Sequence, residues 1–121
     1  MALRCLIVDD NSAFLSAARD LLERQGIAVV GTASTSAEAL ALADALGPDL
    51  TLVDVDLGEE SGFEVSRALV AAGRCGRVVL ISTYAEPDFT ELIDDSQAIG
   101  FVSKSDLSRP AIDALLEADG A

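Results

Sequence analysis

Side chains that could do chemistry follow four apolar segments of this chain. In chain order they are Asp9 and Asp10 after residues 3–8, Asp54 after 50–53, Ser82 after 78–81 and Lys104 after 101–103. The carboxyl ends of parallel strands lie at one edge of a sheet, where open α/β folds bind their ligands. If these segments are parallel strands, one site contains three carboxylates, a hydroxyl and an ammonium, with Asp54 as the expected reactive centre.

The three carboxylates point to a bound divalent cation. Neighbouring carboxylates repel one another unless a hard cation lies between them, and Mg²⁺ accepts oxygen ligands in an octahedron. With the metal bound, Asp54 can attack a phosphorus centre and become an aspartyl phosphate. The Lys104 ammonium offsets charge on the phosphoryl oxygens, and the Ser82 hydroxyl donates to a third oxygen. These residues predict magnesium-dependent phosphoryl transfer.

Strand-like and helix-like patterns alternate along the chain and must position these side chains. Asn11 or Ser12 can cap the first helix, and Thr35 with Glu38 has the capping-box form before the second. The expected strands are 3–8, 27–30, 50–53, 77–81 and 101–103, and the expected helices are 12–25, 36–46, 63–72, 87–95 and one that Ser105 caps. Residues 58–62 are expected to form a polar loop. This alternation predicts an α/β fold with a doubly wound parallel sheet and right-handed crossovers.

Composition bounds the class of protein. The 121 residues, 50% of them apolar, suit one domain over residues 1–121 with a single core. A net charge of −13 with only 8 cationic residues argues against direct nucleic-acid binding. Cys5 and Cys75 are expected to be free thiols in a reducing compartment. Because no signal-peptide pattern or apolar run of roughly 20 residues is present, we expect a cytoplasmic protein without membrane contact.

The same residues, in the same order, resemble a known family. The order Asp9-Asp10, Asp54, Ser82, Phe101 and Lys104 is similar to that of the receiver domain of bacterial two-component response regulators, over nearly the whole chain. The family's phosphoacceptor segment resembles PDLTLVD (48–54) followed by GFEV (62–65), and its final strand resembles GFVSK (100–104). The resemblance implies a flavodoxin-like fold with strand order 2-1-3-4-5 and five helices.

The resemblance also implies a metal site and a phosphoryl donor. Asp54 would accept a phosphoryl group from a sensor histidine kinase or a phosphotransfer protein. Mg²⁺ would be held by Asp10, Asp54, the backbone carbonyl of Asp56 and, through water, Asp9. The chain would catalyse no reaction besides its own phosphorylation and slow autodephosphorylation.

A conformational switch is implied as well. Ser82 would move toward the phosphoryl group and Phe101 would swing inward behind it, which changes the surface formed by the fourth helix, the fifth strand and the fifth helix. A downstream protein or a second copy of the chain would bind this surface. The face is expected to carry Tyr84, Pro87 and Phe89.

Several positions depart from the family pattern. Gly58 replaces a common proline and adds backbone freedom to the loop after Asp54. Thr83 replaces a smaller residue and could crowd phosphoryl access, and Ser105 replaces a proline that often fixes a cis bond. Asp56 and Tyr84 occupy variable positions beside the water path, and we hypothesise that Asp56 alters the phosphoryl lifetime. Glu59 and Glu60 are expected to be solvated surface residues.

Two other functions fit parts of the sequence. In a haloacid-dehalogenase-type phosphatase, Asp54 would be the nucleophile and Asp56 the acid/base, although the order of the remaining parts differs. A receiver-like interaction module that is never phosphorylated would need no acidic pair. We expect no output domain within residues 1–121, which leaves open a stand-alone receiver or a piece of a longer regulator.

Overall fold

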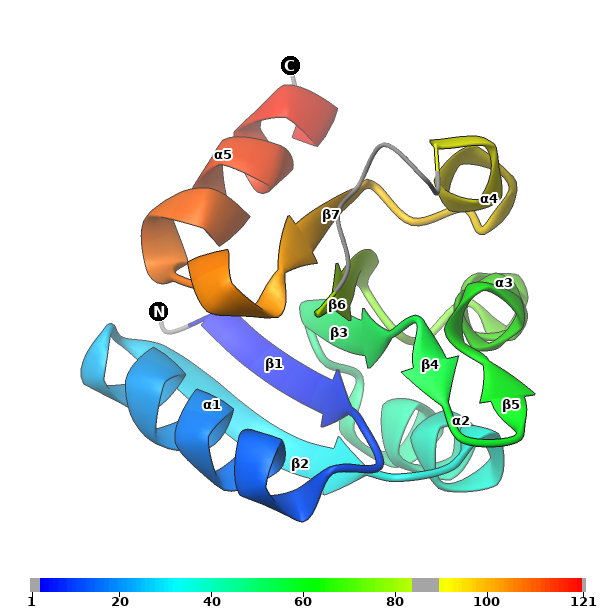
Figure 1. Ribbon diagram of the computed structural model, residues 1–121, viewed down its shortest axis with the longest axis horizontal. Coiled ribbons are helices and arrows are strands. Elements are labelled where there is room, and N and C mark those ends of the chain that lie inside the picture. Colours follow the sequence, from blue (N-terminus) through cyan, green and yellow to red (C-terminus); the bar gives the residue numbers. More distant parts are fainter. Residues whose placement is uncertain (1–2, 84–89, 121) are drawn as a thin grey trace.

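The computed structural model describes residues 3–83 and 90–120, and at its centre lies a parallel sheet of five strands. The strand order is β2-β1-β3-β6-β7, so the expected order is confirmed and β3 is the middle strand (Figure 1). All residues of β3 are buried, as in a parallel sheet covered on both faces. The strands are β1 Leu3–Val8, β2 Ile27–Ala33, β3 Leu50–Asp54, β6 Arg77–Ser82 and β7 Gly100–Ser103.

Helices cover both faces of this sheet, which confirms the doubly wound architecture. α1 and α5 lie on one face, and α2, α3 and α4 lie on the other (Figure 1). Their bounds are α1 Ser12–Arg24, α2 Ser36–Leu46, α3 Gly62–Ala72, α4 Thr90–Asp95 and α5 Arg109–Gly120. The helix start expected at Pro87 lies outside the described residues.

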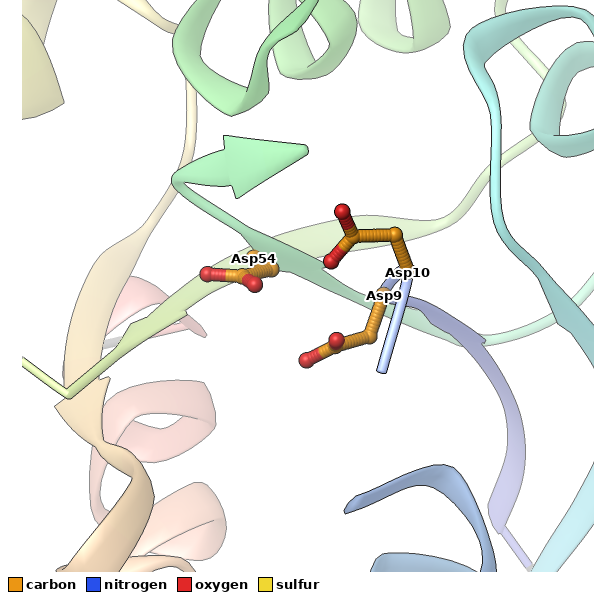
Figure 2. A group of neighbouring side chains, drawn as sticks. All are labelled: Asp9, Asp10 and Asp54. Carbon is orange, nitrogen blue, oxygen red and sulfur yellow. The ribbon is translucent and has the colours of Figure 1, made fainter. Parts of the chain in front are cut away.

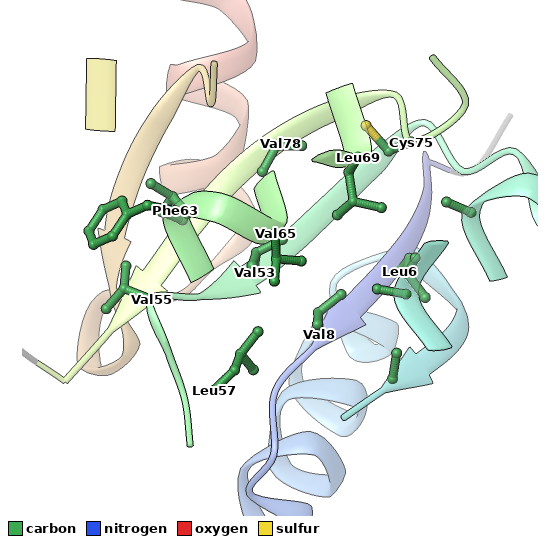
Figure 3. Packing of buried hydrophobic residues seen from close by; sticks show 14 of the residues in the cluster. Leu6, Val8, Val53, Val55, Leu57, Phe63, Val65, Leu69, Cys75 and Val78 are labelled. Carbon is green, nitrogen blue, oxygen red and sulfur yellow. The ribbon is translucent and has the colours of Figure 1, made fainter. Parts of the chain in front are cut away.

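Each face of the sheet has its own apolar cluster. On the α2–α3–α4 face, Leu6, Val8 and Val53 from the central strands pack with Val65 and Leu69 of α3 (Figure 3). The other cluster joins the opposite side chains of the same strands to α1 and α5. Because the central strands are fixed from both sides, their carboxyl ends have well-defined positions.

Two helices begin with the caps that the sequence predicts. Asn11 Oδ1 accepts a hydrogen bond from the N–H of Phe14 at 3.1 Å, and Thr35 Oγ1 accepts one from the N–H of Glu38 at 3.2 Å. The return half of the capping box differs from the expected pattern. Glu38 Oε1 accepts from the hydroxyl of Ser34 at 2.7 Å and its N–H at 3.3 Å, and these bonds lower the pKa of the Glu38 carboxyl.

The start of the last helix was predicted wrongly. Residues Lys104–Asp106 form a short 3-10 helix, and α5 begins only at Arg109. Ser108, rather than Ser105, provides the cap, because its Oγ accepts a hydrogen bond from the N–H of Ala111 at 3.3 Å. Since proline lacks an N–H, Pro110 fits the first turn of this helix. No described peptide bond is cis, so the bond after Lys104 is trans.

The expected polar loop after β3 contains a short antiparallel hairpin. Its strands are β4 Asp56–Leu57 and β5 Glu60–Ser61. Gly58 has a φ of 70°, and Glu59 does not have a positive φ, which is the pattern of a two-residue type II′ turn. Glu59 is exposed as expected, but Glu60 is half-buried and accepts a hydrogen bond from the N–H of Ser36 at 2.9 Å.

Arginine side chains stabilise several helix ends. Four of them donate to a backbone carbonyl in the last turn of a helix or just beyond it, where carbonyls lack partners within the helix, and Arg24 donates to a carbonyl one turn before the end of α1. The pairs are Arg24 with Asp20, Arg109 with Gln25, Arg74 with Asp44, Arg4 with Gly47, and Arg67 with Asp95. These arginines therefore stabilise the helices and the segments that follow them.

Candidate functional site

The strand ends bring the predicted side chains together at one edge of the sheet. Val8 of β1 is in register with Val53 of β3, so Asp9 and Asp10 follow β1 beside Asp54, the last residue of β3. One carboxylate oxygen from each of these three residues lies within 4.8 Å of the others. Figure 2 shows the three side chains extending from the ends of β1 and β3 toward a common space.

The three carboxylates differ in their surroundings. Asp9 is fully buried, and its Oδ1 accepts a hydrogen bond from the N–H of Asn11 at 2.8 Å. Asp10 is exposed, whereas Asp54 is 6% exposed. Asp54 Oδ1 accepts a hydrogen bond from the N–H of Asp56 at 3.2 Å. The cluster therefore has a buried side at Asp9 and an open side at Asp10.

Lys104 joins the two buried carboxylates. Its Nζ lies 2.7 Å from Oδ2 of Asp9 and 3.2 Å from Oδ2 of Asp54. The same Nζ lies 4.3 Å from the centre of the Phe14 ring, a cation–π contact. Burial lowers the pKa of Lys104, but the hydrogen bond and charge of Asp9 and the charge of Asp54 outweigh it, so the pKa is raised. The ammonium stays charged in this site.

Asp54 has a strongly perturbed carboxyl. Burial has the largest effect and raises the pKa of Asp54. The N–H of Asp56 lowers this pKa, the charge of Asp9 raises it, and Lys104 lowers it. The net result is a pKa of about 6 instead of 3.8. The ionised form of Asp54 is therefore destabilised in the absence of a further cation. A buried carboxylate of this kind, next to a fixed ammonium, is typical of functional sites.

An open pocket of about 250 Å³ lies over these groups. Ser82 is 1% exposed at the end of β6, and Thr83, which follows it, is exposed. The pocket is lined by Asp10, Asn11, Asp54, Asp56, Gly58, Ser82, Thr83 and Lys104. It therefore combines oxygen ligands, a hydroxyl and an ammonium around Asp54.

The donor set fits a divalent metal ion. Apart from the ion pair with Lys104, Oδ2 of Asp9 has no hydrogen-bond donor among the described residues, although it is buried. Three converging carboxylates, one of them open to solvent, match the oxygen ligands that hard divalent cations require. The acidic cluster could hold such an ion.

The assembled residues match a sequence family over most of the chain. The pattern of the response regulator receiver domain covers residues 5–116. The chain belongs to this family. Its sequence relatives include a protein of Pseudomonas aeruginosa, assigned as a transcriptional regulator, that is 36% identical over 101 residues, or 84% of this chain and 49% of that protein. The receiver chain spans about half the length of the curated relatives it matches.

Solved structures of response regulators share the receiver fold. A LuxR-family two-component response regulator from Aurantimonas has a TM-score of 0.84 and 29% identity, and the match covers 98% of this chain and 87% of that one. A Burkholderia pseudomallei response regulator has a TM-score of 0.81 and 27% identity, covering 98% and 72%. That structure contains a phosphorylated aspartic acid and a calcium ion. The family is thus one of signalling receivers rather than conventional enzymes such as the phosphatase alternative.

Phe101, the predicted switch aromatic, is not among the residues that line the pocket. Phe101 of β7 is half-buried and packs against the cluster on the α2–α3–α4 face, in register with Leu80 of β6. Tyr84 lies outside the described residues, as do Pro87 and Phe89 of the expected partner face. No helix in the described ranges is long and apolar enough to cross a membrane.

Two contributors to the receiver site were not predicted. Phe14 supports Lys104, and its place one helical turn after Asp10 is the signal that could have identified it. Gly62 begins α3 beside Asp54, and a Cβ there would overlap the backbone oxygen of Asp54. A glycine is therefore required where α3 passes the end of β3, and its place in the GFEV segment is the matching signal in the sequence.

Proposed function

We propose that this receiver chain is a phosphorylation-activated switch in which Asp54 is the phosphoacceptor. The observation that carries the proposal is the convergence of Asp9, Asp10 and Asp54, with Lys104 bridging the two buried carboxylates. A histidine kinase or a phosphotransfer protein would supply the phosphoryl group, as in other two-component systems. The switch would act in the cytoplasm.

The proposed reaction is an in-line displacement at phosphorus. An oxygen of ionised Asp54 forms the new O–P bond while the bond from phosphorus to the donor nitrogen or acyl oxygen breaks, and the donor leaves with that electron pair. Bound Mg²⁺ would neutralise charge on the phosphoryl oxygens and favour the ionised form of Asp54. Asp9, Asp10, Asp54 and the backbone carbonyl of Asp56 would hold it.

The neighbouring side chains would orient the phosphoryl group. Lys104 already lies 3.2 Å from Oδ2 of Asp54, so its ammonium is positioned to shift onto a phosphoryl oxygen. Ser82 lines the same pocket from the adjacent strand and would donate its hydroxyl to another oxygen. Asp56 and Thr83 flank the open side, where water would reach the phosphoryl group during autodephosphorylation.

The output would be a change at the edge of the sheet. β7 is an edge strand between α4 and α5, and it carries Phe101 as well as leading directly to Lys104 (Figure 1). On α4, Leu92 is 48% exposed, an apolar side chain that a protein partner could cover. A downstream protein or a second copy would read the α4–β7–α5 face, without nucleic-acid contact by this chain.

Intact mass spectrometry tests the proposal. The chain is incubated with acetyl phosphate, with and without Mg²⁺, alongside Asp54→Ala and the matched control Asp56→Ala. We expect a magnesium-dependent phosphoryl adduct on the wild-type chain and on Asp56→Ala, and none on Asp54→Ala. No adduct on folded wild-type protein under any condition would favour the unphosphorylated interaction module instead. Steady hydrolysis of a phosphate monoester would favour the phosphatase.

A further inference from the structure

The β4–β5 hairpin borders the acidic cluster. The N–H of Asp56 in β4 donates to Oδ1 of Asp54, and a Cβ on Gly58 would lie 3.4 Å from Oδ2 of Asp10. The hairpin thus donates a hydrogen bond to one of the three carboxylates and passes near a second. Its position determines where Asp56 lies relative to the cluster.

This hairpin is too small to hold its own position. Only two residue pairs join its strands, Asp56 with Ser61 and Leu57 with Glu60, and an isolated two-stranded hairpin is marginal in water. The Gly58 turn has a φ of 70°, which proline cannot adopt because its ring fixes φ near −65°. The hairpin therefore needs attachments outside itself.

Two side chains supply these attachments, one from each strand. Leu57 of β4 is 4% exposed and packs into the cluster that also contains Val8 and Val55 (Figure 3). On β5, Glu60 Oε1 accepts a hydrogen bond from the N–H of Ser36 at 2.9 Å. The apolar contact of Leu57 holds the hairpin against the core, and the hydrogen bond of Glu60 holds it against the start of α2.

The partner of Glu60 is well suited to a carboxylate. Ser36 is the first residue of α2, after the Thr35 N-cap. The first N–H groups of a helix lack partners within the helix, and the helix dipole favours negative charge there. Glu38, the acidic residue of the first turn itself, is occupied by Ser34. Glu60 thus reaches a free donor of α2 from a distant part of the chain.

We propose that Glu60 is a positioning residue for the metal site, whose hydrogen bond to Ser36 anchors the hairpin to α2 and keeps Asp56 beside the acidic cluster. The inference rests on the proposed function, because Asp56 is a ligand only if the cluster binds a metal ion. Glu60 does not touch the metal or the phosphoryl group; it acts through the backbone of the hairpin.

Three variants separate the anchor from the charge: Glu60→Ala, Glu60→Gln and Glu59→Ala. Each removes one negative charge, but only Glu60→Ala removes the acceptor from the Ser36 N–H. Mg²⁺ affinity is measured by titrating the backbone amide signals of ¹⁵N-labelled chains. We expect the dissociation constant to rise roughly tenfold in Glu60→Ala, with less than about a twofold change in the two controls. Without metal, hydrogen exchange at Ser36 should accelerate in Glu60→Ala and not in Glu59→Ala.

A substitution of Ser36, the donor of the same hydrogen bond, tests whether weaker Mg²⁺ binding in Glu60→Ala comes from loss of this bond or from a general loss of structure. Ser36→Pro removes the donor N–H at a position where helices favour proline, and the extended backbone of Thr35 (φ −135°, ψ 164°) suits a residue before proline. This variant should weaken Mg²⁺ binding as much as Glu60→Ala does. The double variant should be no weaker than either single one, because both remove the same bond.

The outcomes distinguish this inference from the function on which it rests. No Mg²⁺ response from the wild-type chain would overturn the proposed function and the positioning role with it. A wild-type response that Glu60→Ala and Ser36→Pro retain would overturn the positioning role alone. Unchanged Ser36 exchange in Glu60→Ala would show that the hydrogen bond does not anchor the hairpin.

Discussion

Replacing Asp54 with Asn should stabilise the metal-free protein at neutral pH. The folded chain holds the proton of Asp54 more tightly than the unfolded chain does, because the pKa is raised from 3.8 to about 6. The folded state is therefore stabilised, relative to one with ionised Asp54, by its tighter binding of this proton. This stabilisation is fully present below pH 3.8 and is lost as the pH rises through about 6. Above that range, the folded protein contains a destabilised carboxylate that the amide of Asn would remove.

The difference between the two pKa values sets the size of the effect. At roughly 1.4 kcal/mol for each pH unit, a rise from 3.8 to about 6 corresponds to as much as about 3 kcal/mol at pH 7.5. The amide oxygen of Asn can still accept from the Asp56 N–H, and Lys104 keeps Asp9 as its partner. Asp56→Asn is the matched control, because Asp56 is exposed and the change also removes one negative charge.

Urea unfolding followed by far-ultraviolet circular dichroism in EDTA would measure this difference, since the chain has no tryptophan. Asp54→Asn should gain up to about 3 kcal/mol over the wild type at pH 7.5 and little at pH 4, and Asp56→Asn should gain little at either. Saturating Mg²⁺ should reduce the gap, because the ion stabilises the wild type by mass action. An equal or lower stability of Asp54→Asn at pH 7.5, or a gap that does not change with pH, would refute the reasoning.

Three further predictions concern the groups around Asp54. Lys104→Met should lower the free energy of unfolding by about 3 kcal/mol in urea titrations, because buried Asp9 loses its cation; unchanged stability would contradict the importance of this ion pair. Gly62→Ala should cost about 3 kcal/mol or more in thermal unfolding, since its Cβ would overlap the Asp54 backbone; a normal melting temperature would mean that α3 shifts freely. Lys104 is the only lysine, so ¹⁵N-lysine labelling gives one Nζ signal. Phe14→Leu should shift that signal, whereas an unmoved signal would rule out the ring contact.

The strand ends were predictable because each carries two independent signals. An apolar run followed at once by Asp, Ser or Lys marks both a buried strand and a polar edge, as at Asp54 and Lys104. The parallel sheet then places these ends together without knowledge of any contact. Thr35 was predictable for a similar reason, because its cap involves neighbours within one helical turn.

The errors concern contacts between distant segments or choices among equivalent residues. Ser105 and Ser108 are both acceptable caps, and only the short 3-10 helix after β7 decides between them. Phe14 has the spacing of an ordinary core residue, and its contact with Lys104 depends on how α1 and β7 meet. Glu60 resembles exposed Glu59 in sequence, but the hairpin brings it to the start of α2, where it accepts a hydrogen bond from the N–H of Ser36. Local patterns contain no information about such encounters.

The arginines at the helix ends also shape the field around the molecule. The net charge of −13 already counts all 8 cationic residues, five of which donate to backbone carbonyls, so the field outside the molecule is negative overall. Exposed charges interact over about 10 Å at 0.1 M salt. Anionic small phosphodonors would therefore be repelled as they approach, and added salt would speed their reaction. A partner with a basic docking face would instead associate faster at low ionic strength. Under the proposed function, the charge distribution would therefore favour such a protein donor over a small anionic one before any contact forms.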